Sequence, residues 1–421
     1  MTNLQKAQAL DQSDRLAEFY QRFYHPENEI YLDGNSLGKQ PLKTKERLVS
    51  VLDGQWGQQL IGSWNKHWLE LPKRIAGKVA QLVNADSGEV IVGESTSVNL
   101  FKLAHALIES GLYPKRLITD SLNFPTDNYI LEGISSYLKL SPPLCVSYSS
   151  DLEADVEQLK EVIRSNPGVL CLSLVSYKSA YYYPAKMLNA FAKSHNSIII
   201  WDLSHAVGAV HLDVKETKTL AAIGCTYKYL NGGPGSPAFM FIDSQLTSTL
   251  SSPIQGWFGH ENPFDFSSAF EAAKGIGKFN AGTPQILSLA ALEVGIDLTL
   301  EAGIKPIREK SEQLGNYLIH LISSELVPLG FALESPENHD QRGSHVTLSH
   351  CDSWRICQCL LNPIEREPKI TIDFRPDKYI RIGIAPLYTR FIDLWQTVER
   401  LRTIVVSKEY EQHDGKKPVV T

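Results

Sequence analysis

The chain has 421 residues, of which 43% are hydrophobic and 21% charged, and it carries a formal net charge of -6 with a pI near 6.1. That length exceeds what one hydrophobic core usually fills, so we expect two subdomains, and the acidic balance argues against nucleic acid or an anionic membrane as a partner. The most apolar run, SIIIWDL (197–203), is too short to span a bilayer, and the first residues lack the pattern of a signal peptide. A cytoplasmic protein is expected.

The first 250 residues predict a helical start followed by alternating strands and helices. Residues 1 to about 30 predict an amphipathic helix, and YLDGNSLG (31–38) predicts a short strand that enters a turn. From about 90 to 250, apolar strand-like runs alternate with helical stretches, as in EVIVGESTSVNLFKLAHAL, KRLITDSLNFPTDNYILEGI and SIIIWDLSHAVGAV. This alternation indicates an α/β domain around a mostly parallel sheet, whose ligands bind at the carboxyl ends of the strands.

The pattern changes beyond residue 290, where two long helical stretches are followed by short strands (HVTLSH, KITIDF, YIRIGIA) and a last helix, FIDLWQTVERLRTIV. Such an order indicates a smaller α+β domain. The predicted division of the chain is an N-terminal helix and segment (1–40), a large α/β domain (41–294), a small α+β domain (295–410) and a frayed polar tail (411–421).

Two charged residues follow strand-like runs. Asp202 ends the most apolar run, and Lys228 stands in GCTYKYLNGGPG after the next one. A buried acid is costly unless it meets a cation or several donors. A carboxylate and a lysine at the ends of neighbouring parallel strands suit pyridoxal phosphate (PLP), since the lysine forms a Schiff base and the acid keeps the pyridine nitrogen protonated. The alternative is an ordinary strand-end acid and a surface lysine.

Two helix starts could complete such a site. Ser95, Thr96 and Ser97 precede a helical pattern, where backbone N–H groups and hydroxyls suit a phosphate. Phe124 and Asp127 stand at the next strand-to-helix junction, where an aromatic ring could stack on a flat cofactor and an acid could accept hydrogen bonds. The alternatives are plain N-capping at the first start and a proline-initiated helix with a packed phenylalanine at the second.

Several blocks together resemble the kynureninase family, in the family's order and over residues from about 30 to 400: YLDGNSLG, STSVNLFKL, FPTDNYI, WDLSHAVGAV, YKYLNGGPGSPAF, QGWFGH, FNAGTPQILSLAALE and YIRIGIAPLY. The YKYLNGG and GWFGH blocks are specific to that family, whereas the acid and the lysine alone occur in many PLP enzymes. The resemblance implies the type I fold of PLP-dependent transferases, in which a large α/β domain with a mostly parallel sheet binds PLP and a smaller α+β domain follows.

The resemblance also implies residue roles. Lys228 would form the Schiff base, Asp202 would hold the pyridine nitrogen, and Tyr227 would donate a proton or hold the phosphate. The other cofactor contacts would be Thr96, Ser97, Phe124, Asp127, Ser173 and His205, with Trp257 and Thr283 reaching the cofactor from the second subunit of a homodimer. Arg381 would bind the substrate's α-carboxylate, and Trp64 would lie near its ring. One departure is that the family's SHSAG reads SHAVG here, beside His205.

The implied activity is that of a hydrolase acting on carbon–carbon bonds. It cleaves the Cβ–Cγ bond of L-kynurenine to give anthranilate and L-alanine, or that of 3-hydroxykynurenine to give 3-hydroxyanthranilate, in tryptophan catabolism or NAD biosynthesis. Thr283 stands where some animal members carry asparagine, and together with Trp64 it favours kynurenine.

Two alternatives stay open. One is a PLP lyase resembling cysteine desulfurase with Cys351 as nucleophile, although HVTLSHCDSWRICQCLL predicts a strand turning into a helix rather than a mobile loop. The other is a non-catalytic binding protein that has kept the PLP fold. Cys351, Cys357 and Cys359 lie near His350 but lack the CxxC pair of a structural zinc site, so no metal is expected.

Overall fold

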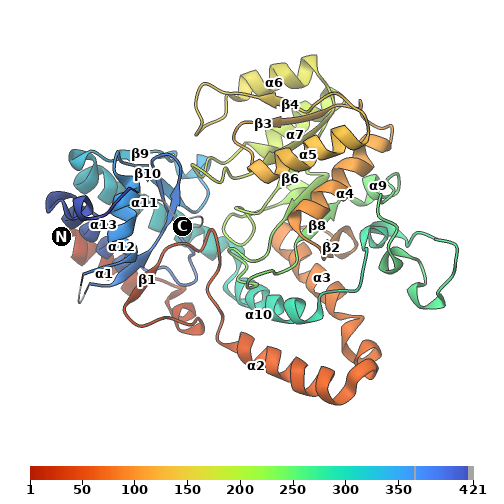
Figure 1. Cartoon of the computed structure of the whole chain (residues 1–421), viewed down its shortest axis with the longest axis horizontal. Coiled ribbons are helices and arrows are strands. Elements are labelled where there is room, and N and C mark those ends of the chain that lie inside the picture. The colour runs from red at the N-terminus through yellow and green to blue at the C-terminus, as the bar shows by residue number, and fades with distance from the viewer. Residues whose placement is uncertain (365–366, 416–421) are drawn as a thin grey trace.

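A seven-stranded sheet forms the centre of the larger lobe in the computed structural model, which describes residues 1–364 and 367–415 (Figure 1). Its strand order is β2-β8-β7-β6-β5-β3-β4, and neighbours are parallel from β7 to β4, whereas β8 runs antiparallel to both β7 and β2. The strands are β2 (Val90–Val92), β3 (Leu117–Asp120), β4 (Leu144–Val146), β5 (Val169–Ser173), β6 (Ile198–Asp202), β7 (Ala221–Gly224) and β8 (Phe239–Ile242).

Both faces of this sheet are covered by helices, as the apolar strands predict. In β6, Ile199 and Trp201 belong to one hydrophobic core, while Ile198 and Ile200 point into another on the opposite face. The helices of this lobe are α2 (Lys43–Val49), α3 (Leu71–Val83), α4 (Thr96–Glu109), α5 (Pro125–Tyr137), α6 (Val156–Ser165), α7 (Ala185–Ser194), α8 (Val214–Thr217), α9 (Ser244–Thr247) and α10 (Ile286–Ala302). None of the helices in the described ranges combines the length and the apolar run that crossing a bilayer requires.

The smaller lobe is built on an antiparallel sheet of order β12-β13-β10-β9, beside a parallel pair of β1 and β11. Its strands are β1 (Glu29–Tyr31), β9 (Ala332–Leu333), β10 (Val346–Ser349), β11 (Lys369–Thr371), β12 (Asp373–Arg375) and β13 (Tyr379–Ile382), and its helices are α1 (Asn3–Gln12), α11 (Ile304–Leu321), α12 (Ser353–Leu361) and α13 (Phe391–Val406). The chain's first helix therefore packs in the lobe formed by its last hundred residues, beside α13 (Figure 1).

The single helix predicted from residue 1 to about 30 is wrong. Helix α1 ends at Gln12, and a short 3-10 helix (Ala17–Arg22) and strand β1 follow it. Asp14 accounts for the break, because its side chain accepts a hydrogen bond from the Leu16 backbone N–H (2.8 Å) and forms a buried ion pair with Lys310 (2.7 Å). Such side-chain bonds to nearby backbone compete with the helical pattern.

At the other end of the chain, the polar tail predicted to fray begins inside regular structure. Residues 409–412 form a 3-10 helix, and Glu409 is tied to α13 by a buried ion pair with Arg400 (2.5 Å). Residues 416–421 lie outside the described residues, so the prediction for them stays a prediction.

Candidate active site

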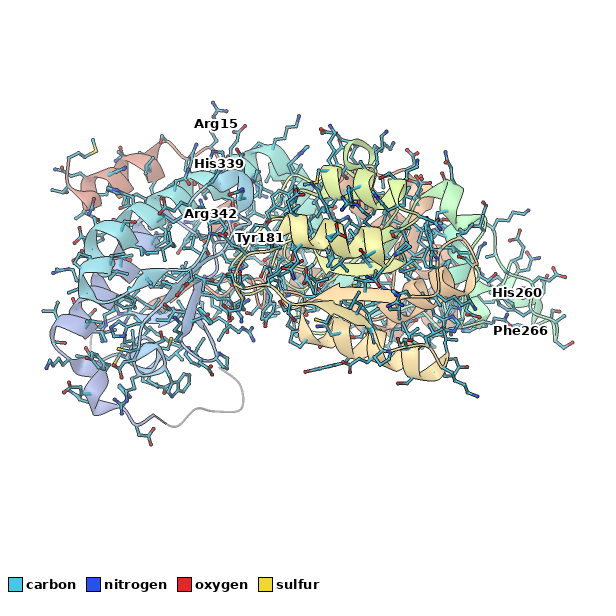
Figure 2. The ribbon with its side chains drawn as sticks, turned by 90° about the horizontal axis from the view of Figure 1, so that it is seen from above. Arg15, Tyr181, His260, Phe266, His339 and Arg342 are labelled. Atoms are coloured by element: carbon cyan, nitrogen blue, oxygen red, sulfur yellow. The ribbon has the colours of Figure 1, made fainter. Side chains whose placement is uncertain are left out.

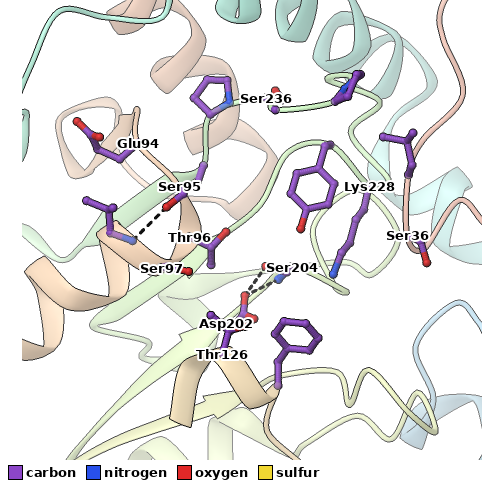
Figure 3. Close-up of a pocket in the computed structure, with 18 of the residues that line it drawn as sticks. Ser36, Glu94, Ser95, Thr96, Ser97, Thr126, Asp202, Ser204, Lys228 and Ser236 are labelled. Atoms are coloured by element: carbon purple, nitrogen blue, oxygen red, sulfur yellow. Dashed lines mark hydrogen bonds between the residues drawn. The ribbon is translucent and has the colours of Figure 1, made fainter. Parts of the chain in front are cut away.

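A cavity of about 780 Å³ opens at the carboxyl edge of the parallel strands (Figure 3). It is bounded by the end of β6, the first turns of α4 and α5, the loop after β7 and the N-terminal segment around Ser36. Predicted residues that line it are Thr96, Ser97, Phe124, Asp127, Asp202, His205, Tyr227 and Lys228. The strand-end location follows from the fold, since all parallel strands end at the same edge.

Lys228 lies in a loop that is neither helix nor strand. Asn231, Gly233 and Gly235 all have positive φ angles (54°, 86° and 72°), which folds the GCTYKYLNGGPG stretch back on itself. The N-terminal segment closes on this loop, because the Gly38 N–H donates to the Tyr227 carbonyl (2.8 Å) and a Cβ at Gly38 would lie 2.2 Å from the Lys228 carbonyl oxygen. The close approach requires glycine there.

The amine of Lys228 lies 2.8 Å from Nε2 of His205. Burial lowers the pKa of His205 well below its usual value, and the charge of Lys228 lowers it further. The imidazole is therefore neutral, and its Nε2 can accept a hydrogen bond from the Lys228 ammonium. Its other nitrogen, Nδ1, is buried and has no hydrogen-bond partner in the part of the chain that the structure describes.

Two buried carboxyl groups face the lysine. Asp202 Oδ1 accepts hydrogen bonds from the backbone N–H (2.9 Å) and the hydroxyl (2.5 Å) of Ser204 (Figure 3). Burial raises the pKa of Asp202, and the Ser204 bonds and the Lys228 charge oppose that rise. Burial, followed by the charge of Asp202, raises the pKa of Asp127 well above its usual value, and Asp127 Oδ2 is buried without a hydrogen-bond partner within residues 1–364 and 367–415.

The opposite wall carries hydroxyls at the start of a long helix. Ser95 caps α4 by accepting a hydrogen bond from the Val98 N–H (3.3 Å), and Thr96 and Ser97 follow it on the cavity wall (Figure 3). The free N–H groups and the positive end of the helix dipole favour an anion there. Tyr227 adds a neutral hydroxyl, since the neighbouring Cys225 thiol and then burial raise its pKa.

These features fit PLP as a set. The helix start suits a phosphate, Phe124 offers an aromatic wall, the buried carboxyl pair suits a protonated ring nitrogen, and Lys228 offers an amine. The unpartnered Asp127 oxygen supports the fit, because a buried polar atom normally finds a donor.

A residue that the sequence did not single out connects the aromatic wall to the sheet. Asn123 is 3% exposed, and its Oδ1 accepts hydrogen bonds from the Ser173 hydroxyl (2.6 Å) and the Phe124 N–H (3.0 Å). Its Nδ2 donates to Thr119 Oγ1 (3.1 Å) and to the Cys171 carbonyl (3.0 Å). Ser173, predicted to contact the cofactor, thus lies buried behind the wall, where it supports Asn123.

Comparison with known proteins agrees with this geometry. A family model described as the kynureninase C-terminal domain matches residues 307–401. Kynureninase of Pseudomonas fluorescens is 37% identical over 417 residues, covering 98% of each chain, and kynureninase of Burkholderia pseudomallei (strain 1106a) is 36% identical over 410 residues, covering 96% of each. The chain belongs to the kynureninase family. The resemblance drawn from the motifs is thereby confirmed.

Solved structures of low sequence identity confirm the fold class. Cysteine desulfurase from Thermococcus onnurineus NA1 superposes with a TM-score of 0.76 at 15% identity, covering 95% of this chain and 98% of that one. A C-DES variant with glycine covalently linked to its PLP cofactor gives a TM-score of 0.77 at 14% identity, covering 91% and 98%. The shared fold is that of the PLP-dependent type I enzymes.

Arg381, which the kynureninase resemblance assigns to the substrate carboxylate, lies next to the cavity. It is 1% exposed on β13, its Nε donates to Asp373 Oδ2 (2.5 Å), and its Nη2 donates to the hydroxyl of Ser36 on the cavity wall (3.2 Å). One hydrogen bond therefore connects the guanidinium to the cavity. Ser36 lies within the YLDGNSLG block, and its place in that block was the only sequence signal that could have found it.

Besides Ser173 and Arg381, three further predicted residues lie outside the cavity of their own chain. Thr283 lines a neighbouring cavity of about 370 Å³, together with Phe258 and Phe264. Trp64 packs against the same two phenylalanines, with ring centroids 5.8 and 6.3 Å away. Trp257 is 38% exposed beside them, in contact with Phe258 (4.4 Å). These residues form an aromatic cluster next to the main cavity.

The cysteines of the C-terminal lobe separate into two environments. Cys357 and Cys359 are buried on the core side of α12, while Cys351 is exposed just before that helix, with its thiol 3.3 Å from Asp352 Oδ2. His350 Nδ1, 3.7 Å from the same sulfur, already accepts the Asp352 backbone N–H (3.0 Å). The main cavity is lined by other segments of the described chain, so Cys351 is poorly placed for the desulfurase alternative.

Proposed function

We propose that this protein hydrolyses the Cβ–Cγ bond of L-kynurenine to anthranilate and L-alanine, with PLP as its cofactor. The observation that carries the proposal is the Lys228 amine and the buried Asp202 carboxyl in one cavity, in a chain that is 37% identical to a kynureninase along 98% of its length. A desulfurase would need a nucleophilic thiol at that cavity, and a non-catalytic protein would not need the amine.

The residues that would hold the cofactor divide by the chemistry of its parts. Thr96, Ser97 and the N-terminus of α4 suit the phosphate, with the Tyr227 hydroxyl as a further donor. Asp202 and Asp127 suit the ring nitrogen, and Phe124 suits the face of the ring. Bound PLP supplies an electron sink, which makes carbon–carbon cleavage accessible at neutral pH.

Lys228 would carry protons between the substrate Cα and the cavity once the substrate has displaced it. Neutral His205 lies 2.8 Å from the amine and can accept a hydrogen bond from it. Because this imidazole carries no positive charge, it holds Lys228 in place without repelling it. Asp202 stays available to hold a ring N–H because Ser204 fixes its other oxygen. Tyr227, whose raised pKa keeps its hydroxyl protonated, can donate a proton to the departing Cβ or serve as a phosphate ligand.

Substrate recognition would come from both lobes. Arg381 is suited to the α-carboxylate because its planar fork, which here donates to Asp373, could hold both oxygens of a substrate carboxylate in that place. Ser36 leads from that guanidinium to the cavity. The aromatic cluster around Trp64 suits the aryl ring of kynurenine. Thr283, at a position where some animal members carry asparagine, favours kynurenine over its 3-hydroxy derivative.

The active unit would be a homodimer in which Trp257 and Thr283 serve the partner's cavity. Exposed large apolar side chains support the dimer: Trp56 is 55% exposed, Ile61 79% and Phe266 78%, and Phe266 stacks on Trp257 with ring centroids 6.5 Å apart. Phe266 lies at the end of the large lobe farthest from the small lobe (Figure 2). Exposed apolar groups in such numbers are typical of surfaces that another protein covers. A cytoplasmic location and a role in tryptophan catabolism, leading to NAD biosynthesis, are part of the same proposal.

Turnover of the two candidate substrates tests the proposal directly. PLP-loaded protein is incubated with kynurenine and with 3-hydroxykynurenine, and the fluorescence of anthranilate and 3-hydroxyanthranilate is followed, with L-alanine measured in parallel. Kynurenine is expected to be the better substrate, and Lys228→Ala should be inactive. Sulfide release from L-cysteine without anthranilate formation would favour the desulfurase alternative, and PLP binding without turnover would favour the binding protein.

A further inference from the structure

The segment from Ser176 to Tyr182, here called the interlobe loop, leaves the sheet after β5 and runs along the C-terminal lobe. Figure 2 shows Tyr181 and Arg342 where the two lobes meet, and these two residues form an isolated antiparallel bridge. The loop therefore belongs to the large lobe by sequence but is attached to the small lobe by its backbone.

Four consecutive carbonyl groups of the interlobe loop accept hydrogen bonds from the C-terminal lobe. The donors, in order along the loop, are Arg381 Nη1 to Tyr177 O (2.5 Å), Thr347 Oγ1 to Lys178 O (2.6 Å), Ser335 Oγ to Ser179 O (2.6 Å) and the Gly343 N–H to Ala180 O (2.8 Å). A fifth bond runs the other way, from the Tyr182 N–H to Gln341 O (2.9 Å). With five bonds in seven residues, the C-terminal lobe sets the position of the loop.

The side chain of Tyr177 points from this loop to the cofactor cavity wall. Its ring meets the ring of Phe124 edge to face, with centroids 5.3 Å apart and planes at 86°. Phe124 is 38% exposed on the cavity, and the Lys228 amine lies 6.0 Å from its ring centroid. An edge-to-face contact fixes the tilt of the ring it touches, because the two quadrupoles attract only in a narrow range of angles.

The backbone of Phe124 is anchored separately, by the Asn123 side chain, so its main chain is held by the sheet while its ring is held by Tyr177. Arg381 closes the connection, because the guanidinium that donates to Tyr177 O also donates to Ser36, which lines the same cavity. A continuous series of contacts thus leads from the C-terminal lobe to the ring of Phe124.

We propose that Tyr177 is a positioning residue, whose ring holds Phe124 at the angle needed against the cofactor, and that the C-terminal lobe sets the place of Tyr177 through the interlobe loop. The inference rests on the proposed PLP-dependent function. It makes the two lobes interdependent: the lobe that carries Arg381 also determines the shape of the cofactor wall.

The test compares Tyr177→Leu and Tyr177→Phe with the matched control Tyr129→Leu, an exposed tyrosine (65%) on α5, the helix that begins directly after Phe124. The readouts are the circular dichroism of the bound cofactor in its visible band and the dissociation constant of PLP. Tyr177→Leu should reduce the visible dichroism and raise the dissociation constant of PLP about two- to tenfold. That increase corresponds to the free energy that an aromatic pair usually contributes. Tyr177→Phe should retain wild-type behaviour because the ring remains, and Tyr129→Leu should change neither quantity.

The role of the C-terminal lobe is tested by the double variant Thr347→Val and Ser335→Ala, which removes two loop anchors without changing a residue on the cavity wall. Its dichroism should shift in the same direction as that of Tyr177→Leu and by less, and kcat for kynurenine should fall more than KM rises. An unchanged spectrum and PLP affinity in Tyr177→Leu would overturn the positioning role, and an unchanged double variant would overturn the part assigned to the lobe. Neither spectroscopic readout uses kynurenine, so failure of the wild-type protein to cleave kynurenine would be recognised separately.

Discussion

Replacing Asn123 by alanine should destabilise the protein and weaken its cofactor site together. The side chain makes four hydrogen bonds at 3% exposure, to Ser173, Phe124, Thr119 and the carbonyl of Cys171. Thr119 belongs to β3, Cys171 and Ser173 belong to β5, and Phe124 immediately precedes α5, so the amide joins two neighbouring strands to the cavity wall.

The magnitude follows from the groups that lose their partner. A buried hydrogen bond contributes about 0.5–1.5 kcal/mol net, and a buried group left without a partner costs about 1–3 kcal/mol. The Thr119 hydroxyl keeps its own hydrogen bond to Asn128 Oδ1 (2.7 Å), whereas the Phe124 N–H is fixed by the helix start and loses its acceptor. We therefore expect Asn123→Ala to lower the free energy of unfolding by about 3 kcal/mol. The displaced Phe124 should raise the dissociation constant of PLP about tenfold, equivalent to about 1.4 kcal/mol.

Urea unfolding of the apoprotein and PLP titration followed by absorbance measure the two effects separately. A double-mutant cycle with Ser173→Ala should give a coupling free energy of about 1 kcal/mol, because the 2.6 Å bond joins the two side chains directly. The control is Asn362→Ala, which removes bonds from the Asn362 amide to Gln358 that are exposed to solvent.

A loss below about 1 kcal/mol in Asn123→Ala, with unchanged PLP affinity, would refute the reasoning. It would mean that water or a rearranged side chain satisfies the groups that Asn123 joins. A large loss of stability without any change in PLP affinity would refute only the link between Asn123 and the cavity wall.

Four further predictions follow from single contacts. Lys228→Ala should remove the visible absorbance band of the cofactor–lysine linkage together with all turnover, and a purified variant that keeps the band would exclude Lys228. Arg381→Lys should raise KM for kynurenine at least about tenfold, far more than it changes the cofactor spectrum, because the planar fork is lost while the charge remains. An unchanged KM would remove Arg381 from carboxylate binding. Burial alone would raise the pKa of Glu293, but hydrogen bonds from cations on α3 lower it to about 2. The ionised Glu293 therefore stabilises the fold by about 2–3 kcal/mol above about pH 4.5, and this stabilisation is lost as the pH falls toward 2. In Glu293→Gln, the free energy of unfolding should depend less on pH over that range. Gly38→Ala should cost about 1–3 kcal/mol and weaken PLP binding, because its Cβ would meet the Lys228 carbonyl; thermal unfolding with normal stability would contradict the close approach.

Local patterns were enough to predict the sheet and the lysine. The apolar runs around Val169, Ile198 and Ala221 are buried strands, because only a strand covered on both faces uses such runs without alternation. Parallel strands end at one edge, so Asp202 and the loop of Lys228 had to face the same crevice. The family followed from whole blocks such as YKYLNGG rather than from any single residue.

The helix predicted over the first thirty residues failed for a physical reason that the sequence hides. Asp14 leaves the helical pattern to pair with Lys310, which lies almost three hundred residues away. Ser36 and Asn123 were missed for a related reason, since serine and asparagine are common in turns and only their partners distinguish them.

The sequence by itself therefore determined the fold class and the family, and it predicted a set of candidate residues of which several line one cavity, because strand periodicity and strand-end position are local properties. Only the tertiary structure decided that neutral His205 holds the Lys228 amine and that Asp127 Oδ2 lacks a hydrogen-bond partner within the described residues. It also decided that Arg381 donates hydrogen bonds to the Asp373 carboxylate, the Ser36 hydroxyl and the interlobe loop. Those outcomes depend on burial and on contacts between segments far apart in the chain, which set the pKa and hydrogen bonding of each group.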